Sequence, residues 1–369
     1  MSGPRLGSWR EGWTGEWPGR WRGRHRRWAD EAAAGRAPYN PWVNPPLIPA
    51  TRSADLPAGL TVDEAVRIAD AITAAHSDST RTMYAWAWSQ WERWCSARGA
   101  HPLPAEPALV CAYLTKRAAD GLSVGTIDLA CGAISYRHRM CGLDDPIHSE
   151  GVRKVRRGLR RIIGTAPRRQ ARPLGTEEIR QIVDTIDRTT AQGARDAAII
   201  LLGFASAMRR SELAALTLAD VEFKPGGLLL TIHRSKTDQY AEGQVVAVVH
   251  GQHAATDPIA ALDAWLTFRG IASGPLFTSM RNKTVTLNPI SGEAISIVLR
   301  KRARAAGLAA ERITAHSLRA GHATSAALAG VALDRIAAQT RHKRLSTLIK
   351  RYIRPAQALE YTSSRDLGL

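Results

Sequence analysis

Thr314 to Thr324 reads Thr-Ala-His-Ser-Leu-Arg-Ala-Gly-His-Ala-Thr and opens an apolar, alanine-rich segment. The segment predicts a helix, on which His316 and Arg319, three residues apart, would share a face. A guanidinium offers a planar fork that suits phosphate or carboxylate oxygens, and an imidazole can move a proton near neutral pH. A solvated helix surface often carries the same pair, so its meaning depends on the rest of the chain.

The composition indicates two domains and a polyanionic partner. The chain has 369 residues, more than one compact core usually organises, and 44% of them are hydrophobic. The formal net charge is +18 at pH 7. An excess of this size predicts nucleic acid as the partner, although an arginine-rich proteome would also give a basic composition.

Several other classes of protein are disfavoured. The four cysteines include no Cys-x-x-Cys pair, so neither a zinc site nor a disulfide framework is predicted. No apolar run reaches about 18 residues, so no membrane span is expected. The N-terminus lacks the apolar region of a secretory signal.

Residues 1–55 are predicted to be a disordered leader rich in Trp and Arg. The tryptophans recur at a helical spacing, but interleaved Gly and Pro oppose a stable helix. The alternative is that Arg and Trp grip nucleic acid by charge and stacking. The tryptophans concerned are Trp9, Trp13, Trp17, Trp21 and Trp28.

Residues 56–163 are predicted to form an all-helical domain, beginning with a capping box of Thr61 and Glu64. Two later helices are expected at 108–119 and 124–141. The helix that precedes these two, around residues 81–95, has an aromatic face that we interpret as core rather than as a base-stacking platform. That face consists of Tyr84, Trp88, Trp91 and Cys95.

Residues 151–172 form a cationic stretch that contains no acidic residue. Its second part belongs to a basic linker predicted at 164–174. Its first part predicts a basic helix. A charge run is often only a solvated face, but cations between two domains favour contacts with DNA phosphates. The candidate DNA-binding residues are Arg153, Lys154, Arg156, Arg157, Arg160, Arg161, Arg168, Arg169 and Arg172.

Residues 175–369 are predicted to form a second domain of α+β type, which makes the chain mainly α with a small β-sheet. Its first helix is expected from Gly175 to about Asp187, capped by Thr176, and its second is apolar and buried. Two strands are expected to form a hairpin with a long turn. The expected strands are 228–234 and 244–250, and the expected helices after the first are 194–207, 255–269, 291–306, 317–329, 332–340 and 345–353.

Three further stretches carry polar groups suited to one site. Ser-Ala-Met-Arg-Arg-Ser-Glu-Leu ends the apolar helix, where Arg209 or Arg210 can point into a site. Lys236 lies in the hairpin turn. His342 is followed ten residues later by Tyr352, within Arg-Tyr-Ile-Arg.

These stretches resemble the signature boxes of the tyrosine recombinases, the phage-integrase family. The first family box has the form Thr-Gly-Leu-Arg-x-Ser-Glu-Leu, matched here by 206–213. The second has the form His-x-Leu-Arg-x-x-x-Ala-Thr, matched from His316 to Thr324. The likeness extends from near residue 60 to 360 and implies that the helical domain is the family's SAM-like core-binding domain.

The chain departs from the family pattern in two ways. Ala207 replaces the usual glycine of the first box. In the family the tyrosine usually lies nine positions after the histidine, whereas Tyr352 lies ten positions after His342. One extra residue turns a helix by about 100°, so a loop or bulge is needed between them. Tyr361 is a less favoured nucleophile because it lacks the Arg-Tyr-Ile-Arg context.

The resemblance implies a catalytic role for each matched residue. Arg209 and Arg319 would hold the non-bridging oxygens of the scissile phosphate. Tyr352 would attack phosphorus and form a 3′-phosphotyrosine, with His316 as its general base. Lys236 would protonate the leaving 5′ oxygen.

His342, by the same resemblance, would hydrogen-bond the phosphate. No metal or nucleotide cofactor is implied, because the phosphotyrosine conserves the energy of the bond. The implied partners are double-stranded DNA target sites and three further copies of the chain, which would exchange strands through a Holliday junction. DNA-bending proteins are implied as accessory partners. The implied location is cytoplasmic and associated with the nucleoid.

Three rival interpretations remain open. A catalytically inactive, DNA-binding relative is supported only by the ten-residue spacing. A type IB topoisomerase would share the catalytic groups but would relax DNA without exchanging strands. A hairpin-forming protelomerase is disfavoured.

Overall fold

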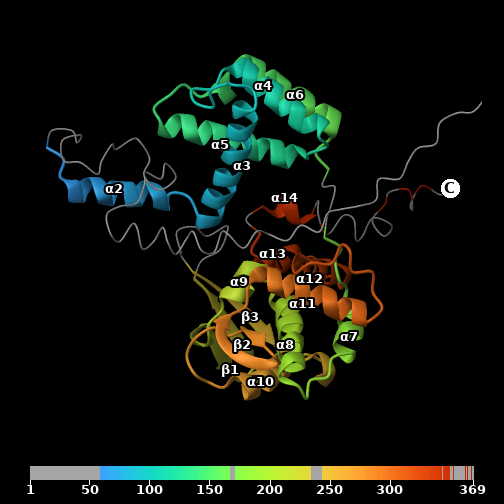
Figure 1. Ribbon diagram of the computed structural model, residues 1–369. Helices are drawn as coiled ribbons and strands as arrows, with labels where there is room; N and C mark the ends of the chain where they lie inside the picture. Colours follow the sequence, from blue (N-terminus) through green and yellow to red (C-terminus); the bar gives the residue numbers. More distant parts are fainter. Residues whose placement is uncertain are drawn as a thin grey trace, which may run out of the picture. The chain divides into compact units, whose positions relative to one another are not determined.

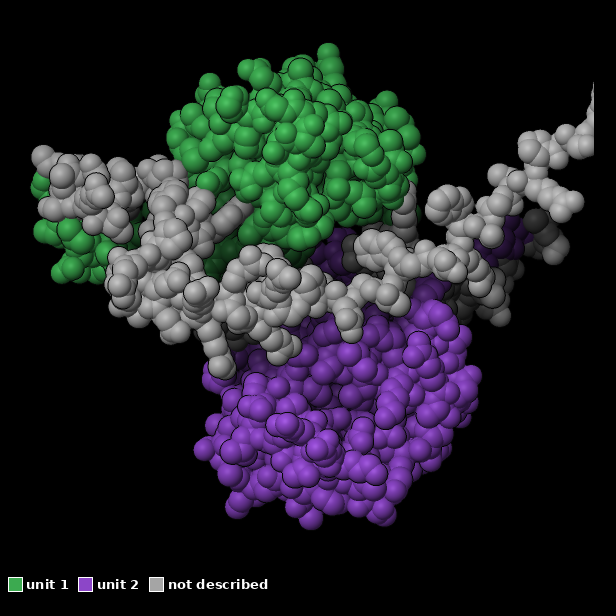
Figure 2. Space-filling view, viewed as in Figure 1, with its two compact units in different colours: residues 1–166 green, residues 167–369 purple. Residues whose placement is uncertain are grey.

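The computed structural model divides into two compact units, residues 1–166 and residues 167–369 (Figure 2). The predicted leader lies outside the residues that the structure describes. The described residues are 59–166, 171–233, 243–342, 344–349, 352, 362, 364 and 367. In this part of the chain no helix has both the length and the apolar character required to cross a membrane.

Unit 1 is helical, as predicted (Figure 1). The capping box at its start is confirmed: Thr61 N donates to Glu64 Oε2 at 2.9 Å, and Glu64 N donates to Thr61 Oγ1 at 3.3 Å. The described elements are α2 (Val62–Ala74), α3 (Asp78–Ser96), α4 (Pro107–Ala119), α5 (Val124–Met140), the 3₁₀ turn η2 (Pro146–His148) and α6 (Glu150–Ile163).

The aromatic face of α3 forms the core of unit 1, as expected. Trp91 is fully buried, and its Nε1 donates to the carbonyl of Pro102 at 2.9 Å. Its ring stacks on Trp94 and meets the edge of Tyr113 from α4. From α6, Val152 and Leu159 are buried in the same cluster, whereas most of the basic residues of that helix are exposed and Arg156 is half-buried.

Unit 2 combines helices with two small antiparallel sheets (Figure 1). The helices are α7 (Thr176–Asp184), α8 (Ala191–Ser206), α9 (Arg210–Ala215), α10 (Pro258–Arg269), α11 (Gly292–Ala305), α12 (His316–Leu328), α13 (Leu333–Thr340) and α14 (Leu345–Leu348), with 3₁₀ turns η3 (Leu218–Asp220) and η4 (Ala254–Thr256). The strands are β1 (Val221–Lys224), β2 (Gly227–Ile232), β3 (Gln244–Val249), β4 (Thr278–Arg281) and β5 (Thr284–Pro289).

The predicted pairing of β2 with β3 is confirmed. Strands β1, β2 and β3 form one sheet in that order, and Leu230 on β2 lies opposite Val246 on β3. Both side chains face the core, which also buries α8. Strands β1, β4 and β5 and the short helix α9 were not predicted, because segments of four to six residues carry little periodicity.

Two details at the start of unit 2 differ from the prediction. The N-cap of α7 is Gly175 rather than Thr176, because Glu178 reaches back to accept from Gly175 N at 2.9 Å, and α7 ends at Asp184. Residues 172–174, assigned to the linker, pack into unit 2. Leu174 is fully buried, and its N–H donates to the carbonyl of Ser317 at 3.2 Å.

Candidate active site

The two arginines of the first box follow the turn between α8 and α9 and have different surroundings. Ala207 ends α8 in the left-handed region (φ 50°), and Arg209 becomes the N-cap of α9. Glu212 accepts from Arg209 N at 2.8 Å and from Arg209 Nη1 at 2.5 Å. Arg210 is exposed and pairs with Glu293 at 2.9 Å. Arg209 is therefore the arginine that faces the site.

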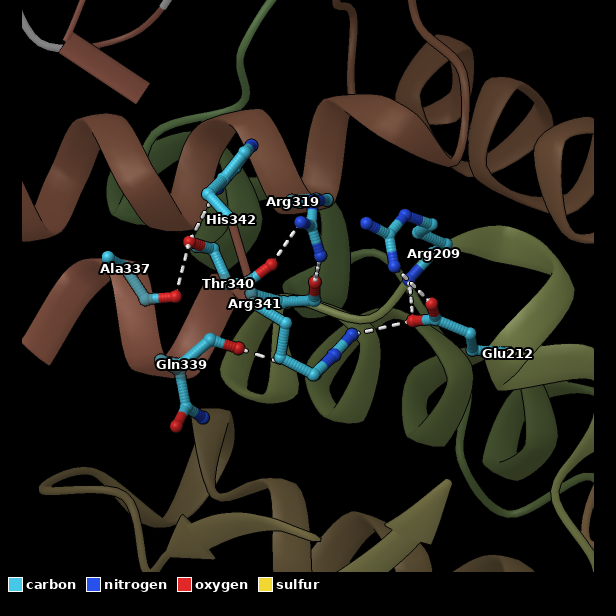
Figure 3. Close-up of polar contacts among 9 residues, drawn as sticks. Arg209, Glu212, Arg319, Ala337, Gln339, Thr340, Arg341 and His342 are labelled. Atoms are coloured by element: carbon cyan, nitrogen blue, oxygen red, sulfur yellow. Dashed lines mark hydrogen bonds and ion pairs between the residues drawn. The ribbon is translucent and has the colours of Figure 1, made fainter. Parts of the chain in front are cut away.

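Arg319, near the start of α12, ties three segments together (Figure 3). Its side chain is buried, its Nη1 donates to the carbonyl of Ala207 at 2.7 Å, and its Nη2 donates to the carbonyl of Thr340. Burial, followed by the nearby charges of Arg209 and Arg341, lowers its pKa to about 10. The guanidinium therefore stays positive at neutral pH, although it has lost most of its water.

Glu212 is a buried carboxylate held between two arginines. Arg341, at the end of α13, donates through Nη2 to Glu212 Oε2 at 2.6 Å (Figure 3). Burial would raise the pKa of Glu212, but Arg341 and Arg209 outweigh it and lower the pKa below its ordinary value. With Arg319, the group holds three guanidiniums and one carboxylate, so it attracts anions.

His316 and Tyr352 form the second half of the site. His316 Nε2 lies 3.0 Å from Tyr352 Oη, and the ring centroid of His342 lies 5.6 Å from that of Tyr352. The phenol is 6% exposed. A histidine nitrogen within hydrogen-bond distance of a phenol is the arrangement that general-base activation of a nucleophile requires.

His342 is held in one tautomer by Thr340. The Thr340 hydroxyl donates to the carbonyl of Ile336 at 2.6 Å, so its oxygen accepts from His342 Nδ1 at 2.7 Å. Burial, then the positive charges of Arg319 and Arg209, lower the pKa of His342 to about 4. The ring is therefore neutral near pH 7, with Nε2 as an acceptor.

The ten-position separation of His342 and Tyr352 does not keep the phenol away from His316. Helix α14 stops at Leu348, and Ile349 and Tyr352 have π-helical backbone. A π turn contains one residue more than an α turn. Of the helix expected over 345–353, the described residues are α-helical to Leu348 and π-helical at Ile349 and Tyr352, which agrees with the expected loop or bulge; residues 350, 351 and 353 lie outside the described part of the chain.

Some predicted site residues lie outside the described part of the chain: Lys236, Arg168, Arg169 and the alternative nucleophile Tyr361. The other cations of the 151–172 stretch fall in two places. Arg172 belongs to unit 2 and pairs with Glu178. Those on α6 are Arg153, Lys154, Arg156, Arg157, Arg160 and Arg161.

The α6 cations differ in their partners. Arg156 and Arg160 both pair with Asp128 of α5, at 3.0 and 2.9 Å. Glu150 lies 3.1 Å from Arg153 and 3.8 Å from Lys154. Exposed cations with no acidic partner in the described chain are Arg157 and Arg161.

Sequence reasoning missed Glu212, Thr340 and Arg341 as members of the site. Glu212 was visible as a capping residue, but its contact with Arg341 crosses 129 positions of sequence. His322, the second histidine of the 314–324 stretch, hydrogen-bonds the carbonyl of Phe204 through Nδ1 at 2.9 Å. Among the described residues, no group of three or more His, Cys, Asp or Glu side chains is arranged to hold a metal ion.

Comparison with known proteins identifies the family. The model of the phage integrase family matches residues 172–358. The chain is 33% identical to the integrase/recombinase XerD homolog of Selenomonas ruminantium over 281 residues, 75% of this chain and 82% of that protein.

Two solved structures have a similar fold. XerH recombinase bound to a palindromic difH substrate has a TM-score of 0.55, at 17% identity over 82% of each chain. A lambda integrase tetramer bound to a Holliday junction has a TM-score of 0.53, at 18% identity over 88% of this chain and 85% of that one. The chain belongs to the phage integrase family of tyrosine recombinases, enzymes that cleave and rejoin DNA strands.

Proposed function

We propose that this recombinase cleaves each DNA strand with Tyr352 and forms a 3′-phosphotyrosine intermediate. The observation that carries the proposal is the 3.0 Å separation of Tyr352 Oη from His316 Nε2, beside the cluster of Arg209 and Arg319. An isolated tyrosine has a pKa near 10. Its phenol therefore needs a base close by in order to react at neutral pH.

The two arginines bind the scissile phosphate. Arg209 is partly exposed, and Arg319 is buried with its Nη1 on the carbonyl of Ala207, two residues before Arg209, so we assign the non-bridging oxygens of one phosphate to this pair. Negative charge on those oxygens grows as the pentacovalent transition state forms. The preorganised guanidiniums therefore stabilise the transition state more than the bound substrate.

Protons and electrons balance without an external reagent. Tyr352 gives its proton to His316 Nε2 as Oη forms the bond to phosphorus. The bond from phosphorus to the 5′ oxygen breaks, and Lys236 donates the proton that the leaving oxygen takes. Attack by a 5′ hydroxyl on the phosphotyrosine reverses these steps and reseals the strand.

His342 completes the phosphate site by changing its protonation state. As a neutral ring it offers only an acceptor at Nε2, because Nδ1 donates to Thr340. The negative charge of an incoming phosphate raises the pKa of His342. The resulting imidazolium then donates from Nε2 to a phosphate oxygen.

Strand exchange requires four such sites on two DNA duplexes. The lambda integrase with a similar fold is a tetramer bound to a Holliday junction. We propose the same assembly here, on double-stranded target sites in the nucleoid, with DNA-bending proteins as possible accessories. Residues 56–163 would act as the core-binding domain, with the exposed cations of α6 contacting DNA phosphates.

A nicked suicide substrate tests the proposal. The DNA is drawn from the region that flanks the gene, and the wild type is compared with Tyr352→Phe and Tyr361→Phe. We expect a covalent protein–DNA band on a denaturing gel that only Tyr352→Phe abolishes. Loss of the band with Tyr361→Phe alone would identify Tyr361 as the nucleophile. Salt-sensitive binding without any covalent band would favour an inactive DNA-binding relative.

The same assay separates strand exchange from topoisomerase activity. A recombinase joins the cleaved strand to a second site, whereas a type IB topoisomerase relaxes a supercoiled plasmid and rejoins the original ends. Recombinant product from two labelled sites is the expected result. Relaxation alone would contradict it.

A further inference from the structure

Arg341 combines two unfavourable features. Its backbone lies in the left-handed region (φ 53°, ψ 47°), which strains an ordinary L-residue but hardly strains glycine. Its side chain is only 4% exposed, although it carries a full charge. The backbone geometry serves to end α13, where Arg341 N donates to the carbonyl of Ala338 and His342 N to that of Ala337, each at 3.1 Å. Glycine would serve that purpose with less strain.

The side chain of Arg341 is directed at a single carboxylate. Nη2 contacts Glu212 Oε2 at 2.6 Å, and Nη1 donates to the carbonyl of Gln339 at a longer 3.3 Å (Figure 3). Nε is buried and has no hydrogen-bond partner in the described structure. The interaction with Glu212 is thus what mainly compensates the burial of this guanidinium.

Glu212 is divided between two arginines. Its Oε1 accepts from Arg209 Nη1, while its Oε2 accepts from Arg209 N and Arg341 Nη2. Without Arg341, the carboxylate would neutralise Arg209 alone. With Arg341 and Arg319 present, the group has a formal net charge of +2 instead of +1, and Glu212 is fixed from both sides.

We propose that Arg341 is a positioning residue of the phosphate site. It holds Glu212 in place, so that Arg209 keeps one orientation, and it offsets the charge of that carboxylate. It does not touch the phosphate itself. This inference rests on the proposed function, in which Arg209 binds the scissile phosphate.

Single-turnover cleavage of the nicked substrate tests the inference, with two substitutions. Arg341→Gly removes the side chain and relieves the backbone strain, whereas Arg341→Met keeps the strain and a long apolar chain. We expect both to slow cleavage by about 10- to 100-fold, the range for residues that orient a neighbouring group of a site. The Kd for the same DNA, measured in a Tyr352→Phe background, should change by no more than about twofold, since the phosphate-binding arginines remain.

The matched control is Arg335→Ala, which removes one exposed positive charge from the same helix. It should cleave at the wild-type rate. A Glu212→Gln background supplies a second test, because removing Arg341 should have little further effect once the carboxylate is gone. Additive losses would show that Arg341 does not act through Glu212 and would overturn the proposal.

Three outcomes separate this inference from the proposed function. Wild type that forms no covalent complex overturns the function, and the inference with it. Wild-type cleavage by Arg341→Gly overturns only the inference, because the side chain is then dispensable. Slow cleavage by both variants, with DNA affinity and the thermal unfolding midpoint of Arg341→Gly retained, supports both.

Discussion

At the scale of single residues, the site depends on buried charges that hold one another in place. Glu212 contacts two arginines, and Arg319 lies behind them with its N–H groups on backbone carbonyls. Glu212, Arg319 and Arg341 are buried, so these charges depend on their partners for compensation. Burial, together with the positive charges of Arg319 and Arg209, lowers the pKa of His342 and keeps the ring neutral until an anion arrives.

Replacing Glu212 by Gln should destabilise the protein by about 3–5 kcal/mol, because two arginines, one of them buried, lose their carboxylate. Urea unfolding measures the change. The matched control is Glu293→Gln, at an exposed carboxylate that pairs with Arg210, where about 0–1 kcal/mol is expected. Equal effects of the two substitutions would contradict the role given to Glu212.

His342 predicts a pH dependence of stability. Its pKa of about 4 in the folded protein lies below the unfolded value of about 6.5. The unfolded chain therefore takes up a proton first as pH falls, and stability that is present above about pH 6.5 is lost toward pH 4. Since the ring is partly exposed, we expect about 1 kcal/mol between pH 7.5 and pH 5.

Urea unfolding of the wild type and of His342→Gln at both pH values measures this contribution. The variant should lose less stability on acidification, while contributions from other histidines, such as His138 and His322, cancel in the comparison. An identical loss in both proteins would show that His342 is not held neutral by its surroundings.

At the scale of elements, the π-helical backbone of Ile349 and of Tyr352 is consistent with the ten-position spacing between His342 and Tyr352. It accommodates an additional residue where an α-helix would have rotated the phenol by about 100°. The turn follows α14 and places Tyr352 among the residues that α12 and α13 bury. The contact of Tyr352 with His316 depends on this local geometry.

Changing the length of this segment tests the π turn. Deleting Lys350 restores the nine-residue spacing, so an α turn should replace the π turn and covalent complex should still form. Inserting one alanine after Leu348 adds a residue that no turn absorbs, and the complex should disappear. Retention with the insertion, or loss with the deletion but not the insertion, would contradict this explanation of the spacing.

The sequence predicted the elements that have local signals. The helices of unit 1 and the β2–β3 hairpin follow from capping residues, periodicity and apolar strands. The short strands β1, β4 and β5 lack such periodicity. Gly175 caps α7 because Glu178 bonds its backbone, a contact that favours no particular side chain at the cap.

The site was predictable in its residues but not in its connections. The motif spacing indicated His316, Arg319 and Tyr352. It could not indicate Arg341, whose partner Glu212 is 129 positions away and whose left-handed backbone would ordinarily suggest glycine. Tertiary packing alone brings these two side chains together.

At the scale of the whole molecule, the chain has a formal net charge of +18. Its cations differ in whether a carboxylate of the same chain already pairs with them. On α6, Arg156 and Arg160 share Asp128, whereas Arg157 and Arg161 are exposed without an acidic partner in the described chain. Cations that already have a carboxylate gain less from a phosphate. We therefore expect unequal contributions to binding along one helix.

Replacing Arg157 and Arg161 together by alanine should reduce the salt dependence of DNA binding. Each lost phosphate contact lowers the slope of log K against log salt by about 0.9, so about 1.8 is expected for the pair. Fluorescence anisotropy with labelled duplex across a salt series measures the slope. Arg156→Ala is the control and should change it little; a larger effect there would reverse the assignment.

The central claim is that Tyr352 makes the covalent bond to DNA. Its most direct test is to digest the covalent complex from the nicked substrate with protease and nuclease, and to locate the residual nucleotide by tandem mass spectrometry. We expect a nucleotide joined through its 3′ phosphate to Tyr352. A nucleotide on Tyr361 or on any other residue would contradict it.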